Sequence, residues 1–438
     1  KAERDKKYGE EKIARSGYSV QTTLNLDWQT KAEAAVSTQV AKLANSNVTN
    51  GSAVIIDPKN GEVRALVGSK DWENQQFGKY NIATATRQPG SSFKPIVYAT
   101  GIENKDFSAA TIFADKATDF GGYAPKNYDL KYRGDVTLRR ALANSLNIPA
   151  VLALQKAGID ETIRTASKMG LTTLAEKNDY GLPMALGSAP ARLTEMTNAY
   201  ATFANAGEHN DITLINSITN KDNKTIFTYK PKNSQAISPQ TAYIMSSMLS
   251  DTIARSELFG RSLNLSSGRV AAVKTGTTED YRDAWTIGYT PSLSIGIWIG
   301  NNDNSPMSRV AGSSGAAPIW KSLMQQILAG SPVEKFIVPS GLTSRSVCRS
   351  SGALAQSSGG NTMTEYFIPG TLPTITCNQV QKTPAPVPTV VPKTEDSSDT
   401  RQNNSSNSGT TGSTSSPNDT TTLPATPPAT PGTNPITP

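Results

Sequence analysis

The strongest constraint on the fold of this chain is a change of composition near residue 381. Residues 381–438 hold eleven of the 27 prolines, no aromatic residue, and only five valines, leucines and isoleucines together. Such a segment cannot bury enough apolar surface to offset the entropy of ordering it. We therefore expect a disordered tail rich in Pro, Ser and Thr, and a folded part confined to the preceding 380 residues.

Charge and residue usage limit the chemistry that the folded part can perform. The net charge is +7, but no run of Lys and Arg marks a nucleic-acid surface, so nucleic acid is not an expected partner. One histidine, His209, and two cysteines are too few for a multi-histidine zinc site or a cysteine-rich cluster. We expect no metal and no cofactor, and we interpret His209, just past a helix end, as an exposed loop residue.

The sequence contains no segment that predicts a membrane span or a signal peptide. No stretch approaches the roughly 18 consecutive apolar residues of a spanning helix. Residues 1–16 carry ten charges, where a signal peptide needs an apolar centre. We expect a soluble chain that begins partway through a longer protein.

Strand and helix patterns follow one another without regular alternation between residues 17 and 380, which favours an α+β fold over a doubly wound sheet. β-Hairpins are predicted at 52–68 and 284–299, with Trp285 and Trp298 as packing residues in the second. Amphipathic periodicity, capping residues and glycine stops predict helices at 31–44, 192–206, 239–249 and 318–328.

Cys348 and Cys377 lie 29 positions apart in a segment rich in Ser and Gly. We favour a disulfide over two buried thiols, because the composition of the tail indicates an extracytoplasmic setting. Closing a loop of this length would contribute about 3–4 kcal/mol in the chain-entropy description of disulfides.

Because the chain has one histidine, a hydrolase or transferase of this sequence would need another catalytic base. A lysine made neutral by burial is the best-attested substitute. Residues 87–95 (RQPGSSFKP) place the hydroxyl of Ser91 and the amine of Lys94 one helical turn apart. Because Pro95 is tolerated only near a helix start, Ser91 is expected at a helix N-terminus, where developing negative charge is favoured. Taken alone, however, the pattern is better explained by a capping serine followed by a solvated lysine.

A second element, Ser145-Leu146-Asn147, offers a hydroxyl that can pass a proton and an amide that can bind a peptide carbonyl. The same Ser-x-Asn pattern recurs at Ser262–Asn264 and twice in the tail, where disorder removes both copies as catalytic candidates. Ser262–Asn264 therefore remains the one alternative to Ser145–Asn147.

A third element, Lys274-Thr275-Gly276-Thr277, follows a strand-like run at 269–273. Glycine within a strand marks the close approach of another backbone or of a ligand, here beside a cation and hydroxyls suited to a carboxylate. The three elements occur in one order along the chain, and together they favour a catalytic interpretation over three unrelated surface features.

In this order the elements resemble those of the penicillin-recognising serine transferases and hydrolases. Residues 87–95, 127–151 and 273–291 are similar to the transpeptidase domain of class A, bifunctional penicillin-binding proteins, and residues 17–29 resemble the linker after the glycosyltransferase domain of that class. The resemblance covers about residues 10–380. It implies an antiparallel sheet flanked by helices, as in the serine β-lactamases.

The resemblance also implies a division of the chain into four parts. Residues 1–50 would be the linker after an absent glycosyltransferase domain, and residues 51–333 the transpeptidase domain. Residues 334–380 would form a small C-terminal segment with the possible disulfide, followed by the tail at 381–438.

The catalytic roles that the resemblance implies fall on four residues. Ser91 would attack the bond between two terminal D-alanines of a peptidoglycan stem peptide, and an amine of a neighbouring stem would then take the acyl group. Lys94 would be the base, with a pKa lowered by burial and by Lys274. Ser145 would relay the proton to the leaving amine.

The binding roles implied by the resemblance fall on the same motifs. Asn147 would orient the donor peptide, and Thr275 and Thr277, beside Gly276, would hold its terminal carboxylate. The backbone N–H groups of Ser91 and Thr277 would form the oxyanion hole.

The expected partners are donor and acceptor stem peptides and β-lactam antibiotics, which would acylate the same serine. The implied location is the extracytoplasmic face of the bacterial membrane, reached through an N-terminal anchor that is missing here. A D,D-carboxypeptidase, a serine β-lactamase and a non-catalytic β-lactam receptor remain alternatives. We interpret the acidic group Glu279, Asp280 and Asp283 as a solvated turn rather than a metal site.

Overall fold

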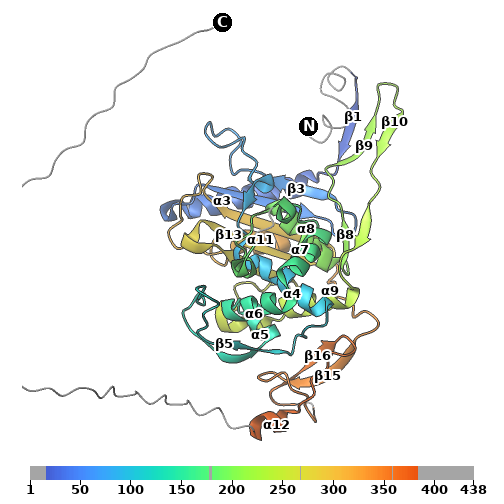
Figure 1. Ribbon diagram of the computed structural model, residues 1–438. Helices are drawn as coiled ribbons and strands as arrows, with labels where there is room; N and C mark the ends of the chain where they lie inside the picture. The colour runs from blue at the N-terminus through green and yellow to red at the C-terminus, as the bar shows by residue number, and fades with distance from the viewer. Residues whose placement is uncertain (1–15, 177–179, 267, 358, 383–438) are drawn as a thin grey trace, which may run out of the picture. The chain divides into compact units, whose positions relative to one another are not determined.

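The computed structural model describes residues 16–176, 180–266, 268–357 and 359–382 (Figure 1). The predicted disordered tail at 381–438 lies outside the described residues from position 383 onward, as do residues 1–15. The described residues between 16 and 382 belong to one compact unit.

A five-stranded antiparallel sheet forms the centre of the fold. Its strand order is β12-β13-β14-β2-β3, and every neighbouring pair is antiparallel. The strands are β2 (Asn50–Ile56), β3 (Val63–Val67), β12 (Ala272–Thr277), β13 (Asp283–Thr290) and β14 (Leu293–Gly300). The predicted hairpins at 52–68 and 284–299 are β2–β3 and β13–β14, and Trp285 pairs with Trp298 in the second, both buried as expected.

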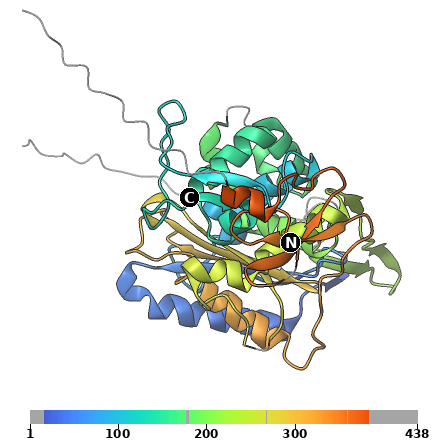
Figure 2. The same ribbon diagram turned by 90° about the horizontal axis from the view of Figure 1, so that it is seen from below.

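Helices cover both faces of this sheet, which confirms the α+β class. Alternation along β2 sends Val54 and Ile56 into one apolar core and Ala53 and Ile55 into the other. The second core is closed by α3 (Leu26–Lys42) and α11 (Ala317–Ile327), drawn in blue and orange on one side of the sheet in Figure 2. The first is closed by helices between residues 94 and 249, which are α4 (Lys94–Glu103), α5 (Leu138–Ala143), α6 (Asn147–Ala157), α7 (Ile159–Lys168), α8 (Leu193–Ala204) and α9 (Pro239–Leu249).

Smaller elements surround this layered core. They are the sheet β1-β9-β10 (Ser19–Thr22, Ile215–Thr219, Thr225–Thr228), the pairs β8–β11 (Glu208–Asn210, Asn233–Gln235), β4–β7 (Thr86–Arg87, Ala191–Arg192) and β5–β6 (Ile112–Asp115, Gly134–Thr137), and α10 (Thr252–Phe259). The C-terminal hairpin β15–β16 (Thr343–Cys348, Thr362–Phe367) is followed by α12 (Cys377–Lys382). A disulfide joins Cys348 to Cys377, the pair for which we favoured a bridge, with their Cα atoms 6.1 Å apart.

The helix boundaries follow local capping chemistry. The helix predicted at 239–249 is α9, and the hydroxyl of Ser238 accepts a hydrogen bond from the backbone N–H of Thr241. The predictions at 192–206 and 318–328 differ from α8 and α11 by one or two residues at each end. The prediction at 31–44 starts five residues late, because the side chain of Asn25 caps the backbone N–H of Trp28 and α3 begins at Leu26.

The interpretation of His209 as an exposed loop residue is wrong. Gly207 ends the preceding turn, and the chain enters β8 directly, where His209 pairs with Ser234 of β11. The ring is buried, its Nδ1 lies 3.3 Å from the hydroxyl of Thr202, and burial lowers its pKa. None of the helices in the described ranges is long and apolar enough to cross a bilayer.

Candidate active site

The Ser-x-x-Lys element lies at the start of α4, where its proline predicts it. Ser91 belongs to a 3₁₀ turn (η3, Gly90–Phe93) that runs directly into α4, and Pro95 occupies the first helical turn. Proline costs the helix no hydrogen bond there, because the first N–H groups of a helix have no intrahelical acceptor. The hydroxyl of Ser91 is half-buried and lines a cavity of about 550 Å³.

Two glycines bring the Lys-Thr-Gly strand against this turn. A Cβ atom at Gly276 would lie 2.2 Å from the carbonyl oxygen of Pro89, and one at Gly90 would lie 2.7 Å from that of Thr277. No side chain larger than hydrogen fits at either position without moving a backbone. The end of β12 is therefore packed directly on η3, which is the close backbone approach that a glycine in a strand predicts.

Lys94 is fully buried behind the cavity. Its Nζ donates to the carbonyl oxygens of Ser145 at 2.6 Å and Leu146 at 3.0 Å, and to Oδ1 of Asn147 at 2.6 Å. Burial lowers the pKa of Lys94 well below its usual range, the nearby Lys274 lowers it further, and Asp115 opposes both. The lowered pKa favours the neutral amine, which is the form that can accept a proton.

Ser145 joins the two lysines. Nζ of Lys274 donates to the Ser145 hydroxyl at 2.7 Å and to the carbonyl of Thr275 at 2.8 Å, while the Ser145 carbonyl accepts from Lys94. Ser145 lies between α5 and α6 with a left-handed backbone (φ 56°), and this conformation lets its carbonyl face Lys94 while its hydroxyl faces Lys274. Burial lowers the pKa of Lys274 to about 7.

The cavity brings together residues from all three sequence elements. Ser91, Ser145, Asn147, Thr275 and Thr277 line it. The Thr277 hydroxyl accepts a hydrogen bond from the backbone N–H of Gly312 at 3.0 Å. The other lining residues come from the segment 123–130, the end of α10, the turn after β12, the segment 311–313 and the end of the 3₁₀ turn η5 (Leu182–Leu186). They include Tyr123, Lys126, Tyr128, Leu130, Leu186, Phe259, Glu279, Tyr281 and Ser313.

The alternative Ser-x-Asn element does not reach this cavity. The Ser262 hydroxyl donates to the carbonyl of Phe259, and Oδ1 of Asn264 accepts from Arg255. Both side chains thus serve the turn after α10, and neither lines the cavity.

The interpretation of the acidic group as a solvated turn is wrong for one member. Glu279 and Asp280 are exposed, but Asp283 begins β13 and is buried. Its Oδ1 accepts a hydrogen bond from Nε1 of Trp298 at 2.8 Å, and burial raises its pKa. Among the described residues no cluster of three His, Cys, Asp or Glu side chains could hold a metal ion.

Motif analysis missed the wall of the cavity formed by residues 123–130. This segment links β5 to β6, and it has no periodicity that would predict its place. The one signal in its sequence is the presence of large apolar residues such as Tyr128 and Leu130 in an irregular segment. In the structure these two residues leave 61% and 71% of their surfaces exposed. Large apolar side chains so exposed beside a cavity are typical of ligand-binding surfaces.

The sequence matches two families of known domains. Residues 51–325 match the penicillin binding protein transpeptidase domain, and residues 338–382 match the C-terminal domain of penicillin-binding protein 1A. Penicillin-binding protein 2D of Bacillus subtilis (strain 168) is 32% identical over 390 residues, which are 86% of this chain and 55% of that protein. The chain spans about half the length of the curated relatives it matches.

Solved structures show the same fold. The crystal structure of penicillin-binding protein 1A from Haemophilus influenzae aligns with a TM-score of 0.75 at 24% identity, covering 86% of this chain and 76% of that one. PonA1 from Mycobacterium tuberculosis, in complex with penicillin V, aligns with a TM-score of 0.69 at 25% identity, covering 77% and 93%.

Proposed function

The chain belongs to the transpeptidase family of class A penicillin-binding proteins, which act in peptidoglycan synthesis, and we propose that it crosslinks stem peptides as a D,D-transpeptidase. The observation that carries this proposal is the chain of contacts Lys94–Ser145–Lys274, whose Ser145 lines the same cavity as Ser91. We assign the reaction to residues 51–333, with residues 334–380 as a separate small segment. The reaction would take place outside the cytoplasmic membrane, where peptidoglycan lies.

In the acylation step, Oγ of Ser91 attacks the carbonyl carbon between two D-alanines, and its proton passes to Lys94. The three acceptors around Nζ of Lys94 match a protonated amine. A neutral amine has two hydrogens, so it would release one acceptor and turn its lone pair toward the serine. The carbonyl of Leu146, with the longest of the three contacts, is the one we expect to be released.

The C–N bond then breaks, and the leaving D-alanine amine takes a proton from the Ser145 hydroxyl, which regains one from the ammonium of Lys274. Backbone N–H groups of Ser91 and Thr277 would stabilise the oxyanion, each by about 3–4 kcal/mol. The second half of the reaction transfers the acyl group from Ser91 to the amine of another stem and restores the hydroxyl. Thr275 and Thr277 would bind the terminal carboxylate of the donor.

The test is intact-mass analysis of the chain after incubation with a penicillin, followed by sequencing of the modified peptide. We expect one adduct on Ser91, and no adduct in Ser91→Ala or Lys94→Ala. Labelling of Ser91→Ala at the wild-type level would exclude Ser91 as the nucleophile.

Product analysis with a D-alanyl-D-alanine peptide separates the alternatives. A crosslinked product in the presence of an amine acceptor supports transpeptidation, and a trimmed peptide alone supports a carboxypeptidase. Hydrolysed antibiotic released with turnover would indicate a β-lactamase. Acylation without any peptide product would indicate a β-lactam receptor.

A further inference from the structure

A buried carboxylate lies behind the candidate active site. Asp115, the last residue of β5, has no exposed surface. It accepts hydrogen bonds from Nδ2 of Asn127 at 2.8 and 3.0 Å and from the backbone N–H of Arg133 at 2.9 Å. In the described part of the chain no lysine or arginine side chain forms an ion pair with it. A buried charge held only by neutral donors is unfavourable for stability, so packing alone does not account for an acid at this position.

The carboxylate determines which way the amide of Asn127 points. Nδ2 of Asn127, itself buried, also donates to the carbonyl of Lys131 at 2.8 Å, so all its hydrogens face acceptors. Its Oδ1 therefore faces the other way and accepts from the backbone N–H of Asn147 at 2.8 Å. Reversing the amide would place its oxygen against the carboxylate of Asp115 and a carbonyl, and would leave Asn147 without its acceptor.

Asn127 thereby caps the helix that carries the Ser-x-Asn element. Asn147 is the first residue of α6, its N–H has no intrahelical acceptor, and Leu146 at the cap position supplies no side-chain bond. The Asn147 amide is itself oriented, since Nδ2 donates to the carbonyl of Lys126 at 2.6 Å and Oδ1 accepts from Lys94. An oriented chain of hydrogen bonds thus runs from Asp115 through Asn127 and Asn147 to Nζ of Lys94.

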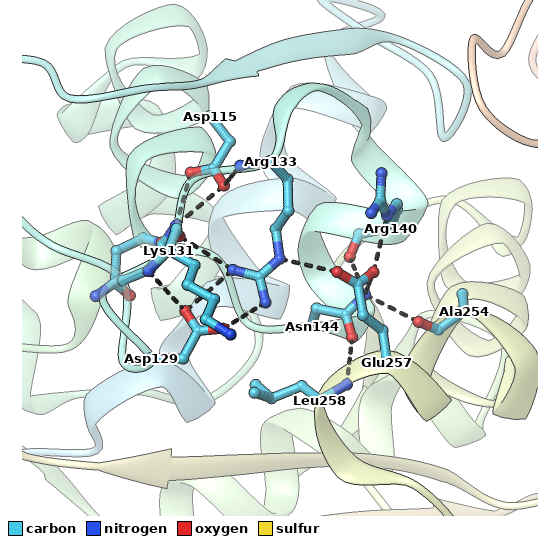
Figure 3. A network of polar contacts seen from close by, with 11 residues as sticks. Asp115, Asp129, Lys131, Arg133, Arg140, Asn144, Ala254, Glu257 and Leu258 are labelled. Carbon is cyan, nitrogen blue, oxygen red and sulfur yellow. Dashed lines mark hydrogen bonds and ion pairs between the residues drawn. The ribbon is translucent and has the colours of Figure 1, made fainter.

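Separate contacts hold the segment on which Asn127 lies. Figure 3 shows the guanidinium of Arg133 between Asp129 and Glu257, with Glu257 also accepting from Arg140. The same view places Asp115 beside the backbone of Arg133, on the opposite side from Glu257. Asp129 also accepts from the backbone N–H of Lys131, whose carbonyl accepts from Asn127, so this pair is coupled to the oriented chain. Asp135, exposed on β6 opposite Ala114, lies outside that chain and offers a matched control.

We infer that Asp115 and Asn127 are positioning residues for the proposed acylation reaction: they orient Asn147 and, through it, the amine of Lys94. This inference rests on the proposed function, because it assigns the pair a purpose in that reaction. Neither side chain would touch the substrate's reacting atoms, and both would act through Asn147.

The test compares Asp115→Asn and Asn127→Ser with Asp135→Asn. Asp115→Asn conserves volume but turns one acceptor oxygen into a donor facing Asn127, so the amide of Asn127 loses its fixed direction. We expect the second-order rate of Ser91 acylation by a fluorescent penicillin to fall at least tenfold in both positioning variants. In Asp135→Asn the rate should stay within about twofold of the unmodified chain, and thermal unfolding would show that all three variants are folded.

The pH dependence separates positioning from general loosening of the fold. The charged groups that face Lys94 are Lys274, across Ser145, and Asp115. Removing the negative charge of Asp115 lowers the pKa of Lys94, so the acidic limb of the acylation profile should move to lower pH in Asp115→Asn. A merely structural defect would lower the rate by the same factor at every pH.

A measurement that does not depend on acylation tests the inference separately from the proposed function. Hydrogen–deuterium exchange of the peptide containing the Asn147 amide should be faster in Asn127→Ser than in Asp135→Asn. Wild-type acylation rates in both positioning variants, or equal exchange in Asn127→Ser and Asp135→Asn, would overturn the inference and leave the proposed function intact. An unmodified chain that is never acylated would overturn both.

Discussion

Ser145 adopts a backbone conformation that few serines adopt, and through this conformation Ser145 contacts the amines of both Lys94 and Lys274. A non-glycine residue in the left-handed region is disfavoured by roughly 1–2 kcal/mol. Here the turn presents the carbonyl of Ser145 to Lys94 and its hydroxyl to Lys274. Strain of this kind persists only where surrounding contacts hold it, and it is frequent at active sites.

Replacing Lys274 by Gln should change both the rate and the pH profile of acylation. A protonated Lys274 lowers the pKa of Lys94, because like charges repel. Removing it raises the pKa of Lys94, so the acidic limb of the profile should move to higher pH. The Ser145 hydroxyl also loses its donor, and the maximal rate should fall by about 10²-fold.

Acylation rates between pH 5 and 10 measure both effects. Lys131→Gln removes an exposed positive charge near the site without touching Lys94 and is the control. An acidic limb that stays in place, or moves to lower pH, in Lys274→Gln would contradict the electrostatic coupling.

The sequence predicts those residues of the candidate site that lie within a few positions of one another in a short motif. Ser91 and Lys94 are one turn apart, and Lys274 lies two residues before the glycine that brings β12 against η3. Asp115 and Asn127 escaped it, because their contact joins a strand end to an irregular segment and their partner lies 20 residues further along the chain. No pattern in the sequence predicts which way a buried amide points.

Among the secondary-structure elements, the contact between β12 and η3 sets the position of Ser91 relative to the Lys-Thr-Gly strand. It is a contact of backbone with backbone, so no side-chain rearrangement can relieve an added atom. Other boundaries at this scale follow short-range chemistry. α9 begins at Pro239 behind the Ser238 cap, whereas His209 was misplaced because pairing of β8 with β11 depends on residues 25 positions apart.

Gly276→Ala should therefore affect stability and activity together. The new Cβ would lie 2.2 Å from the carbonyl oxygen of Pro89, which forces β12 away from η3. Overpacking of this kind destabilises by about 1–3 kcal/mol. We expect a lower midpoint of urea unfolding and at least a tenfold slower acylation of Ser91.

Gly181→Ala is the matched control for this substitution. The nearest atom to a Cβ at Gly181 is Cδ of Pro183 at 3.5 Å, an ordinary contact, and its backbone is extended (φ −101°). Unchanged unfolding and acylation in Gly276→Ala would show that β12 can move without disturbing Ser91.

For the molecule as a whole, the C-terminal hairpin is tied to the helix that leads into the active site. Arg139 of α5 donates to both carboxylate oxygens of Glu365 in β16, at 2.6 and 2.7 Å, and both side chains are buried. Arg139 also donates to the carbonyl of Ser247, and its Nη1 lies 3.4 Å from the carboxylate of Asp251. Residues more than 220 positions apart thus share one buried ion pair, and no pattern in the sequence predicts it.

Glu365→Ala should destabilise the chain by about 3 kcal/mol, because it leaves the Arg139 guanidinium buried without its main partner. Asp251 offsets part of that loss, so we expect the low end of the usual range. Urea unfolding measures the change. Arg345→Ala, at an exposed position opposite Glu365 in the hairpin, is the control and should change the free energy of unfolding by less than about 0.5 kcal/mol.

The double substitution Arg139→Met with Glu365→Leu should recover most of the stability, since an apolar pair removes the unpaired charge. If Glu365→Ala unfolded like the unmodified chain, the hairpin would be held by its apolar contacts alone, and the ion pair would contribute nothing to its attachment.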